Sequence, residues 1–168
     1  MFKWIAFIVF MMLLGLHIQH VMRYTPCRSN TDHRIYHVIA NASDKQEAAN
    51  RLSFLVNRMQ GFVIDLDKRQ CHFPKYAKMI QRLVCRYPPK RVKEGVDGCH
   101  FIKNKQEELV ICVRDTETQC FTPLHKLREV MIHELAHIAS RGTGHDKEFH
   151  INNKFLLKQS NHFFLPKH

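Results

Sequence analysis

The chain has 168 residues, enough for one domain of ordinary size and a short appendage. Its 26 lysines and arginines outnumber 15 aspartates and glutamates, which gives a formal net charge of +11 at pH 7. Such a surplus favours anionic partners, either nucleic acid or an anionic membrane surface, and a solvated basic surface explains it equally well. Because the cations are scattered and not set in a stripe with interleaved aromatics, nucleic-acid binding is only weakly signalled.

The N-terminal segment is apolar and uncharged. Residues 4–22 lack Asp, Glu, Lys and Arg, so 19 residues precede Arg23, close to the roughly 20 that a helix needs to cross a bilayer. Small residues suited to signal cleavage are missing at its end, so a cleaved signal peptide and a buried core helix rank below an uncleaved anchor. The sequence therefore predicts a single-pass membrane protein with a transmembrane anchor over residues 1–24, flanked by Trp4 and Tyr24 at the interfaces.

The side of the membrane on which the rest of the chain would lie is left open. Arg23, Arg28 and Arg34 follow the apolar segment, against Lys3 before it, and the positive-inside rule then favours the cytoplasmic face. The triplet at residues 41–43 is an N-glycosylation acceptor, which matters only in a secretory compartment. None of the six cysteines is arranged as C-x-x-C, so a second zinc site is poorly supported.

Residues 25–34 are polar and turn-rich, which predicts a linker into one folded domain over residues 35–168. Short apolar runs predict strands in that domain, at residues 35–40, 62–66 and 109–113. Apolar residues at helical spacing predict two scaffold helices, from Ser43 to Gly61 and from Pro74 to Tyr87. Gln46 stands at the capping-box position of the first helix, and residues 90–105 are expected to be irregular.

A further helix is expected after Pro123. Its apolar residues recur at spacings of three and four, as in the inward stripe of an amphipathic helix: Leu124, Leu127, Met131, Leu135 and Ile138. Thr122 suits the N-cap and Pro123 suits the first helical position. The pattern therefore predicts that the histidines within this stretch lie on a real helix.

His133 and His137 stand four residues apart on this helix, with Glu134 after the first of them. At that spacing both imidazoles project from one face with their β-carbons about 6 Å apart, so two nitrogens can reach one metal ion. Glu134 is turned about 100° around the helix axis, where it can reach a metal-bound water without binding the metal. This is the His-Glu-x-x-His arrangement of zinc proteases, in which the glutamate is the general base. Two surface histidines on a core helix are the alternative interpretation.

A catalytic zinc site needs a third protein ligand and an open fourth position. Gly142 and Gly144 permit the chain to turn back, and His145 follows that turn, which makes it the preferred third ligand. Three other donors follow and stay open as rivals: Asp146, Glu148 and His150. The metzincin pattern is excluded because Thr143 stands where its third histidine would be. A last helix is expected after Asp146, and its start would hold His145 near the metal.

The run His133-Glu134-Leu135-Ala136-His137, followed by His145-Asp146-x-x-Phe149, resembles the WLM group of zinc metallopeptidases, with SprT-like proteases as more distant relatives. The resemblance covers roughly residues 42–160. It implies an α+β, zincin-like metalloprotease domain in which helices pack on a short mixed sheet, here preceded by one transmembrane helix. It further implies His133, His137 and His145 as Zn²⁺ ligands, Glu134 as the catalytic base and peptide bonds as the substrate.

The sequence thus predicts a membrane-tethered zinc metalloendopeptidase of the HExxH type that acts on a protein or peptide. Two alternatives stay open: a DNA-associated protease that acts on DNA–protein crosslinks, as family members do, and a non-catalytic zinc-stabilised binding domain. An intact Glu134 argues against the second, because a structural zinc site needs no base. No oligomeric state is indicated.

Three residues outside the motif are secondary candidates. His100 and His125 could stabilise an oxyanion, although each is more often an ordinary surface histidine. Arg114 could bind a substrate carboxylate, although a solvated charge is the simpler interpretation. An extended substrate could add as a further strand beside residues 109–113.

Overall fold

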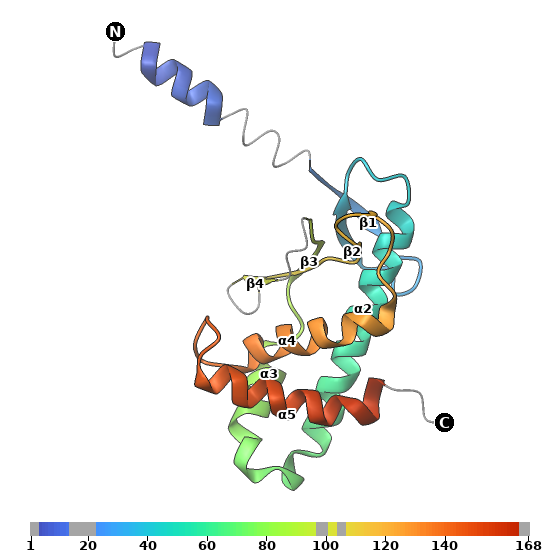
Figure 1. Ribbon diagram of the computed structural model, residues 1–168, viewed down its shortest axis with the longest axis vertical. Coiled ribbons are helices and arrows are strands. Elements are labelled where there is room, and N and C mark those ends of the chain that lie inside the picture. The colour runs from blue at the N-terminus through green and yellow to red at the C-terminus, as the bar shows by residue number, and fades with distance from the viewer. Residues whose placement is uncertain (1–3, 14–22, 97–100, 104–106, 165–168) are drawn as a thin grey trace.

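The computed structural model describes residues 4–13, 23–96, 101–103 and 107–164 (Figure 1). Within them, five strands form one sheet in the order β1-β2-β3-β5-β4. The strands are β1 (Tyr24–Arg28), β2 (Ile35–Ile39), β3 (Arg91–Glu94), β4 (Phe101–Lys103) and β5 (Glu108–Ile111). The central strands β2, β3 and β5 run parallel, and the outer strands β1 and β4 run antiparallel to their neighbours. The sheet is therefore short and mixed, as the sequence predicted.

Three of these strands lie where the sequence indicated none. β1 occupies part of the predicted linker and pairs with β2, so that Cys27 lies opposite Tyr36. β3 and β4 fall within residues 90–105, which were expected to be irregular. In β3 an inward position is held by Glu94, fully buried because it accepts hydrogen bonds from the Ile39 amide and from Arg114. A charged residue on the inner face interrupts the alternation of apolar and polar residues by which a strand is recognised in a sequence.

Helix α2 (Lys45–Lys68) is longer than predicted and runs straight through Gly61. Phe62, Val63 and Leu66 are buried and continue the inward stripe at helical spacing, so the strand predicted over residues 62–66 is wrong. Gly61 does not end the helix. It permits close packing, because a β-carbon there would lie 2.9 Å from Cζ of Phe163.

The predicted capping box at the start of α2 is also absent. Asp44 is the N-cap residue and no side chain caps the first turn by a hydrogen bond. Gln46 donates its side-chain amide to the carbonyl of Arg28 instead, 2.9 Å away, and so ties α2 to the end of β1. The side chain of Gln46 therefore bonds to a distant strand and not to the first turn of its own helix.

Helices α3 (Ala77–Arg86), α4 (Arg128–Ala139) and α5 (Lys147–Phe164) complete the domain. Figure 1 shows α4 and α5 side by side below the strands, with α3 next to them, while α2 passes from the sheet to these helices. The core between the layers is made of buried apolar residues from α2, α3, α4, α5 and the inner strands. The prediction of an α+β fold with helices packed on a short mixed sheet is confirmed.

The predicted membrane anchor is contradicted. In the part of this segment that the structure describes, residues 4–13 are helical. Among the residues that the structure describes, no helix has the length and apolar character needed to cross a membrane. The rest of the predicted anchor, residues 1–3 and 14–22, lies outside the described residues. The single-pass membrane localisation is therefore corrected, and the boundaries proposed at residues 24 and 34 stay a prediction.

Candidate metal centre

Helix α4 brings the first two predicted ligands onto one half-buried face. Met131, Ile132 and Leu135 are buried, which fixes the rotation of the helix against the core. His133 and His137, one turn apart, are left half-buried on the opposite side. The helix begins later than predicted, since Leu124–Leu127 form a 3-10 turn, η3, before α4 starts at Arg128.

The three predicted metal ligands come together in space. The Nε2 atom of His133 lies 3.2 Å from Nε2 of His137 and 3.1 Å from Nε2 of His145. Among the described residues, His133, His137 and His145 are the group of His, Cys, Asp or Glu side chains whose donor atoms all lie within 4.8 Å of one another. We refer to these three residues as the histidine trio.

The histidine trio fits a zinc ion better than it fits hydrogen bonding. Nitrogens held 2.0–2.1 Å from a tetrahedral zinc lie about 3.3 Å apart, close to the two spacings found here. A neutral imidazole nitrogen either donates or accepts one hydrogen bond in its ring plane, yet Nε2 of His133 faces two other nitrogens. Burial lowers the pKa of His133, and the neighbouring His145 adds to this, so the neutral form that binds metal is favoured.

The loop after α4 places His145. A β-carbon on Gly142 would clash with Oδ2 of Asp146, so a larger residue there would displace that carboxylate. The other oxygen of Asp146 accepts a hydrogen bond from the amide of Phe149, 2.8 Å away, and thereby caps the start of α5. His145 directly precedes this cap, which confirms the expectation that the start of the last helix holds it in place.

Phe149 forms an apolar support under the histidine trio. Its ring is buried, and its centroid lies 4.9 Å from that of His133, 4.4 Å from that of His137 and 4.6 Å from that of His145. Contact with one rigid ring restricts the rotamers of three imidazoles from two elements. Preorganisation of this kind lowers the cost of assembling a metal site.

The rival third ligands are engaged elsewhere or lie farther off. Asp146 caps α5, and Glu148 forms an ion pair with Arg82, Nη2 to Oε1 2.6 Å. The ring of His150 is 6.4 Å from that of His145 and does not join the trio. The donors that meet are therefore those of the preferred assignment.

Glu134, which follows His133 on α4, is buried and has an unpartnered oxygen. Its side chain is 1% exposed, and Oε2 has no hydrogen-bond partner in the structure. Burial raises the pKa of Glu134 to about 7. A buried carboxylate without a partner is costly, and such groups are concentrated at functional sites.

Two arginines of α3, which the sequence assigned to scaffold, hold the end of α4. Arg86 donates from Nη1 to the carbonyls of Ile138 and Ser140, each at 2.9 Å. Arg82 donates from Nε to the carbonyl of Ala139 at 2.9 Å and pairs with Glu148. These are terminal carbonyls that no intrahelical donor can satisfy. Two arginines at helical spacing look like solvated charges, so the sequence carried no signal for this role.

Glu148, which pairs with Arg82, also contacts the loop that carries His145. Its Oε2 accepts a hydrogen bond from the backbone amide of Arg141, 3.1 Å away. Inside the fold, Ser140 donates to the carbonyl of Ala136 at 2.7 Å and accepts from the amide of Asn152 at 2.9 Å. The loop between the second and third histidines is therefore tied to α3, α4 and α5.

The secondary candidates do not join the trio. Arg114 is not a solvated charge: it pairs with Glu94 at 2.6 Å and with Asp44 at 2.7 Å, and stacks on Phe121. His125 lines a separate hollow at the start of α4. His100 lies outside the described residues.

The strand to which a substrate could add also differs from the expectation. β5 pairs with β3 on one side and β4 on the other, so both of its edges are filled. β4 is the outer strand at that end of the sheet and contacts α4. An extended chain could therefore add at β4, not beside β5.

Comparisons with known proteins agree with this description. The WLM domain family model matches residues 100–163, which hold β4, β5, α4 and most of α5. The uncharacterised protein R325 of Acanthamoeba polyphaga mimivirus is 27% identical over 135 residues, covering 79% of this chain and 68% of that protein. The crystal structure of Wss1 from Saccharomyces cerevisiae superposes with a TM-score of 0.51 at 16% identity, over 73% of this chain and 84% of that one. These likenesses support a WLM-type domain and its fold.

Proposed function

We propose that this protein is a zinc-dependent metallopeptidase. His133, His137 and His145 hold the ion and Glu134 is the general base. The observation that carries the proposal is the meeting of three imidazole nitrogens, at spacings of 3.1 and 3.2 Å, together with a buried, unpartnered oxygen on Glu134, the residue after His133. The match of residues 100–163 to the WLM domain supports an enzyme of the metalloprotease type.

Zinc bound to the trio would supply a Lewis acid, which lowers the pKa of water to about 7 and polarises a carbonyl oxygen. Glu134 accepts a proton from the attacking water at Oε2 and passes it to the leaving nitrogen of the cleaved peptide bond. Its pKa of about 7, raised by burial, is close to the value at which a group both takes and releases a proton near neutral pH. Phe149 keeps water from the rear of the imidazoles and fixes their rings.

A DNA-associated protease that acts on crosslinked proteins is the second candidate. It is supported by the resemblance to the WLM group and by the net charge of +11. Cleavage of a protein substrate that is stimulated by DNA separates this candidate from a general peptidase. A non-catalytic zinc domain is less well supported, since it gives no reason for a buried, unpartnered Glu134.

Metal analysis of the full chain, followed by an unbiased peptide-cleavage screen, tests the proposal. We expect one zinc per chain and chelator-sensitive cleavage. A chain that binds no divalent metal, or one whose cleavage survives complete removal of zinc, would overturn it.

A further inference from the structure

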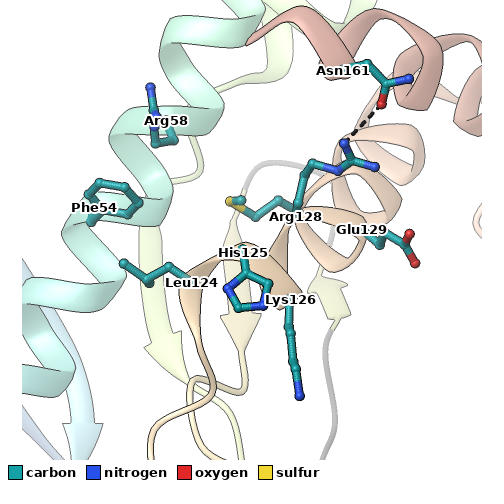
Figure 2. Close-up of a pocket in the computed structure, with 9 residues that line it drawn as sticks. Phe54, Arg58, Leu124, His125, Lys126, Arg128, Glu129 and Asn161 are labelled. Atoms are coloured by element: carbon teal, nitrogen blue, oxygen red, sulfur yellow. Dashed lines mark hydrogen bonds between the residues drawn. The ribbon is translucent and has the colours of Figure 1, made fainter. Parts of the chain in front are cut away.

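The hollow that His125 lines lies where α2, η3, α4 and α5 meet, and none of the histidine trio lines it (Figure 2). Its volume is about 800 Å³. Phe54 and Arg58 on α2 form one side, and residues of η3 and the start of α4 form the other. A space of this size is large enough for several side chains of a bound ligand.

The floor of the hollow is apolar. Met131 is buried, Leu124 is half-buried, and Phe54 is 41% exposed, one of the few large apolar side chains of α2 in contact with solvent. Leaving an aromatic ring in water costs hydrophobic free energy that a bound apolar group would recover. The floor therefore suits an aliphatic or aromatic side chain.

The rim of the hollow carries three cations, Arg58, Lys126 and Arg128, and of these Lys126 is near enough to Asp115 to help lower the pKa of that carboxyl. Among the described residues no Asp or Glu lies within ion-pairing distance of them, whereas other arginines, such as Arg82 and Arg114, are paired. Arg128 donates to a neutral acceptor, the side-chain oxygen of Asn161, 3.0 Å away (Figure 2). The guanidinium of Arg58 lies 5.6 Å from the centroid of the Phe54 ring.

The combination of floor and rim favours a peptide over nucleic acid. Among the described residues that line the hollow, three cations and Glu129 leave a net charge of +2. The cations surround an apolar floor and do not form the continuous track that a phosphate backbone follows. A peptide segment with carboxylates next to an apolar side chain is complementary to both the cationic rim and the apolar floor.

The hollow is close enough to the histidine trio to bind the same polypeptide. Glu129 precedes His133 by four residues on α4, a rise of about 6 Å along the helix axis. An extended chain covers that distance in about two residues. Along α5 the separation is larger, since Asn161 follows Phe149 by twelve residues, a rise of about 18 Å, so a polypeptide with a peptide bond at the trio would reach the hollow with residues about two to six positions away.

We propose that this hollow binds an acidic segment of the polypeptide substrate, with an apolar side chain on Phe54, Leu124 and Met131 and carboxylates at Arg58, Lys126 and Arg128. The inference rests on the proposed function and specifies its substrate class: sequences in which acidic and apolar residues flank the cleaved bond.

Binding is measured by fluorescence anisotropy on the full, zinc-loaded chain carrying Glu134→Gln, which removes cleavage from the readout. The probe is a labelled peptide of alternating glutamate and leucine, and its partner is the same peptide with glutamine for glutamate. Arg128→Glu and Lys126→Glu reverse rim charges, and Lys78→Glu makes the same change at an exposed position on α3 outside the hollow. Lys126 is exposed on η3, so its variant is informative even if reversal at Arg128 disturbs folding.

We expect the acidic peptide to bind more tightly than the glutamine peptide and each rim reversal to weaken it about fivefold, in line with exposed charge pairs. Lys78→Glu should change the affinity less than twofold, and added salt should weaken binding. Equal affinity for the two peptides, or an equal loss with Lys78→Glu, would overturn the proposal. So would a short oligothymidylate that binds more tightly than the peptide and depends on the same rim cations.

Cleavage of an unstructured protein by the wild-type chain is measured separately, so that the two proposals fail in different ways. If wild type cleaves but rim reversal leaves its preference for acidic over neutral peptides unchanged, the hollow is not a substrate site and the peptidase stands. If nothing is cleaved while the acidic peptide binds through the rim cations, the peptidase is wrong and the docking surface stands.

Discussion

The Nε2 atoms of His133 and His145 lie 3.1 Å apart although the two residues belong to different parts of the fold. His133 is fixed by the packing of α4, whereas His145 depends on a loop and on the start of α5. Their distance is therefore a property of how α4 and α5 pack, and the predictions below depend on it.

Glu134→Gln should separate metal binding from catalysis. The glutamine keeps the shape of the buried side chain and lacks the basic oxygen, so zinc content should equal that of wild type while cleavage falls by about 100-fold or more. Zinc stoichiometry and peptide cleavage are measured on the same preparation. Cleavage that persists at the wild-type rate in the zinc-loaded variant would rule out Glu134 as the base.

His145→Ala should weaken zinc binding severely, because two ligands rarely make a stable site. The loss should exceed the roughly 10- to 100-fold typical of residues that only support a ligand. Competition with a chromogenic chelator measures it. His150→Ala is the matched control, since its ring is 6.4 Å from that of His145, and it should keep the wild-type affinity. Equal losses in the two variants would contradict the assignment of His145.

Glu148→Gln should weaken zinc binding because it leaves His145 less firmly positioned. Loss of the pair with Arg82 and of the bond from the Arg141 amide loosens the loop, so we expect a loss of about tenfold. In the His145→Ala background the same change should have little further effect, because the ligand that it positions is gone.

Glu108→Gln is the control for that experiment. It breaks an ion pair with Lys93 of comparable burial, Nζ to Oε2 2.8 Å, in the sheet. If it weakened zinc binding as much as Glu148→Gln does, the effect would reflect general destabilisation and not the position of His145.

The pair of Asp44 and Arg114 should contribute fully to stability above about pH 4 and progressively less as the pH falls further. Hydrogen bonds from Arg114 hold the pKa of Asp44 below its usual value. A carboxyl whose pKa is lower in the folded state stabilises that state above its unfolded pKa, about 3.9, and this contribution is lost as the pH falls through the folded value. Because the side chain of Asp44 is 42% exposed, the effect should be modest.

Asp44→Asn measures this contribution. Urea unfolding at several pH values should show the variant less stable than wild type near neutral pH, with a difference that shrinks as the pH is lowered towards about 2. A difference that stays constant over this range would mean that the carboxylate charge is not involved.

Local patterns in the sequence determined the helix that carries the motif and the relation between its two histidines. Spacings of three and four residues fix which side chains of α4 face the core, and the same geometry places His133 and His137 on one half-buried face. The buried strand β5, the last helix and the place of His145 before its cap were predicted on similar grounds. Each of these depends on residues that are close together in the chain.

The tertiary structure decided what depends on distant partners. Glu94 is an inward strand residue only because Arg114 lies across from it, and Gly61 continues a helix because the Phe163 ring packs there. Arg82 and Arg86 serve the metal centre only because α3 packs at the end of α4. Such roles come from pairings between segments far apart in sequence, which periodicity along one segment does not encode.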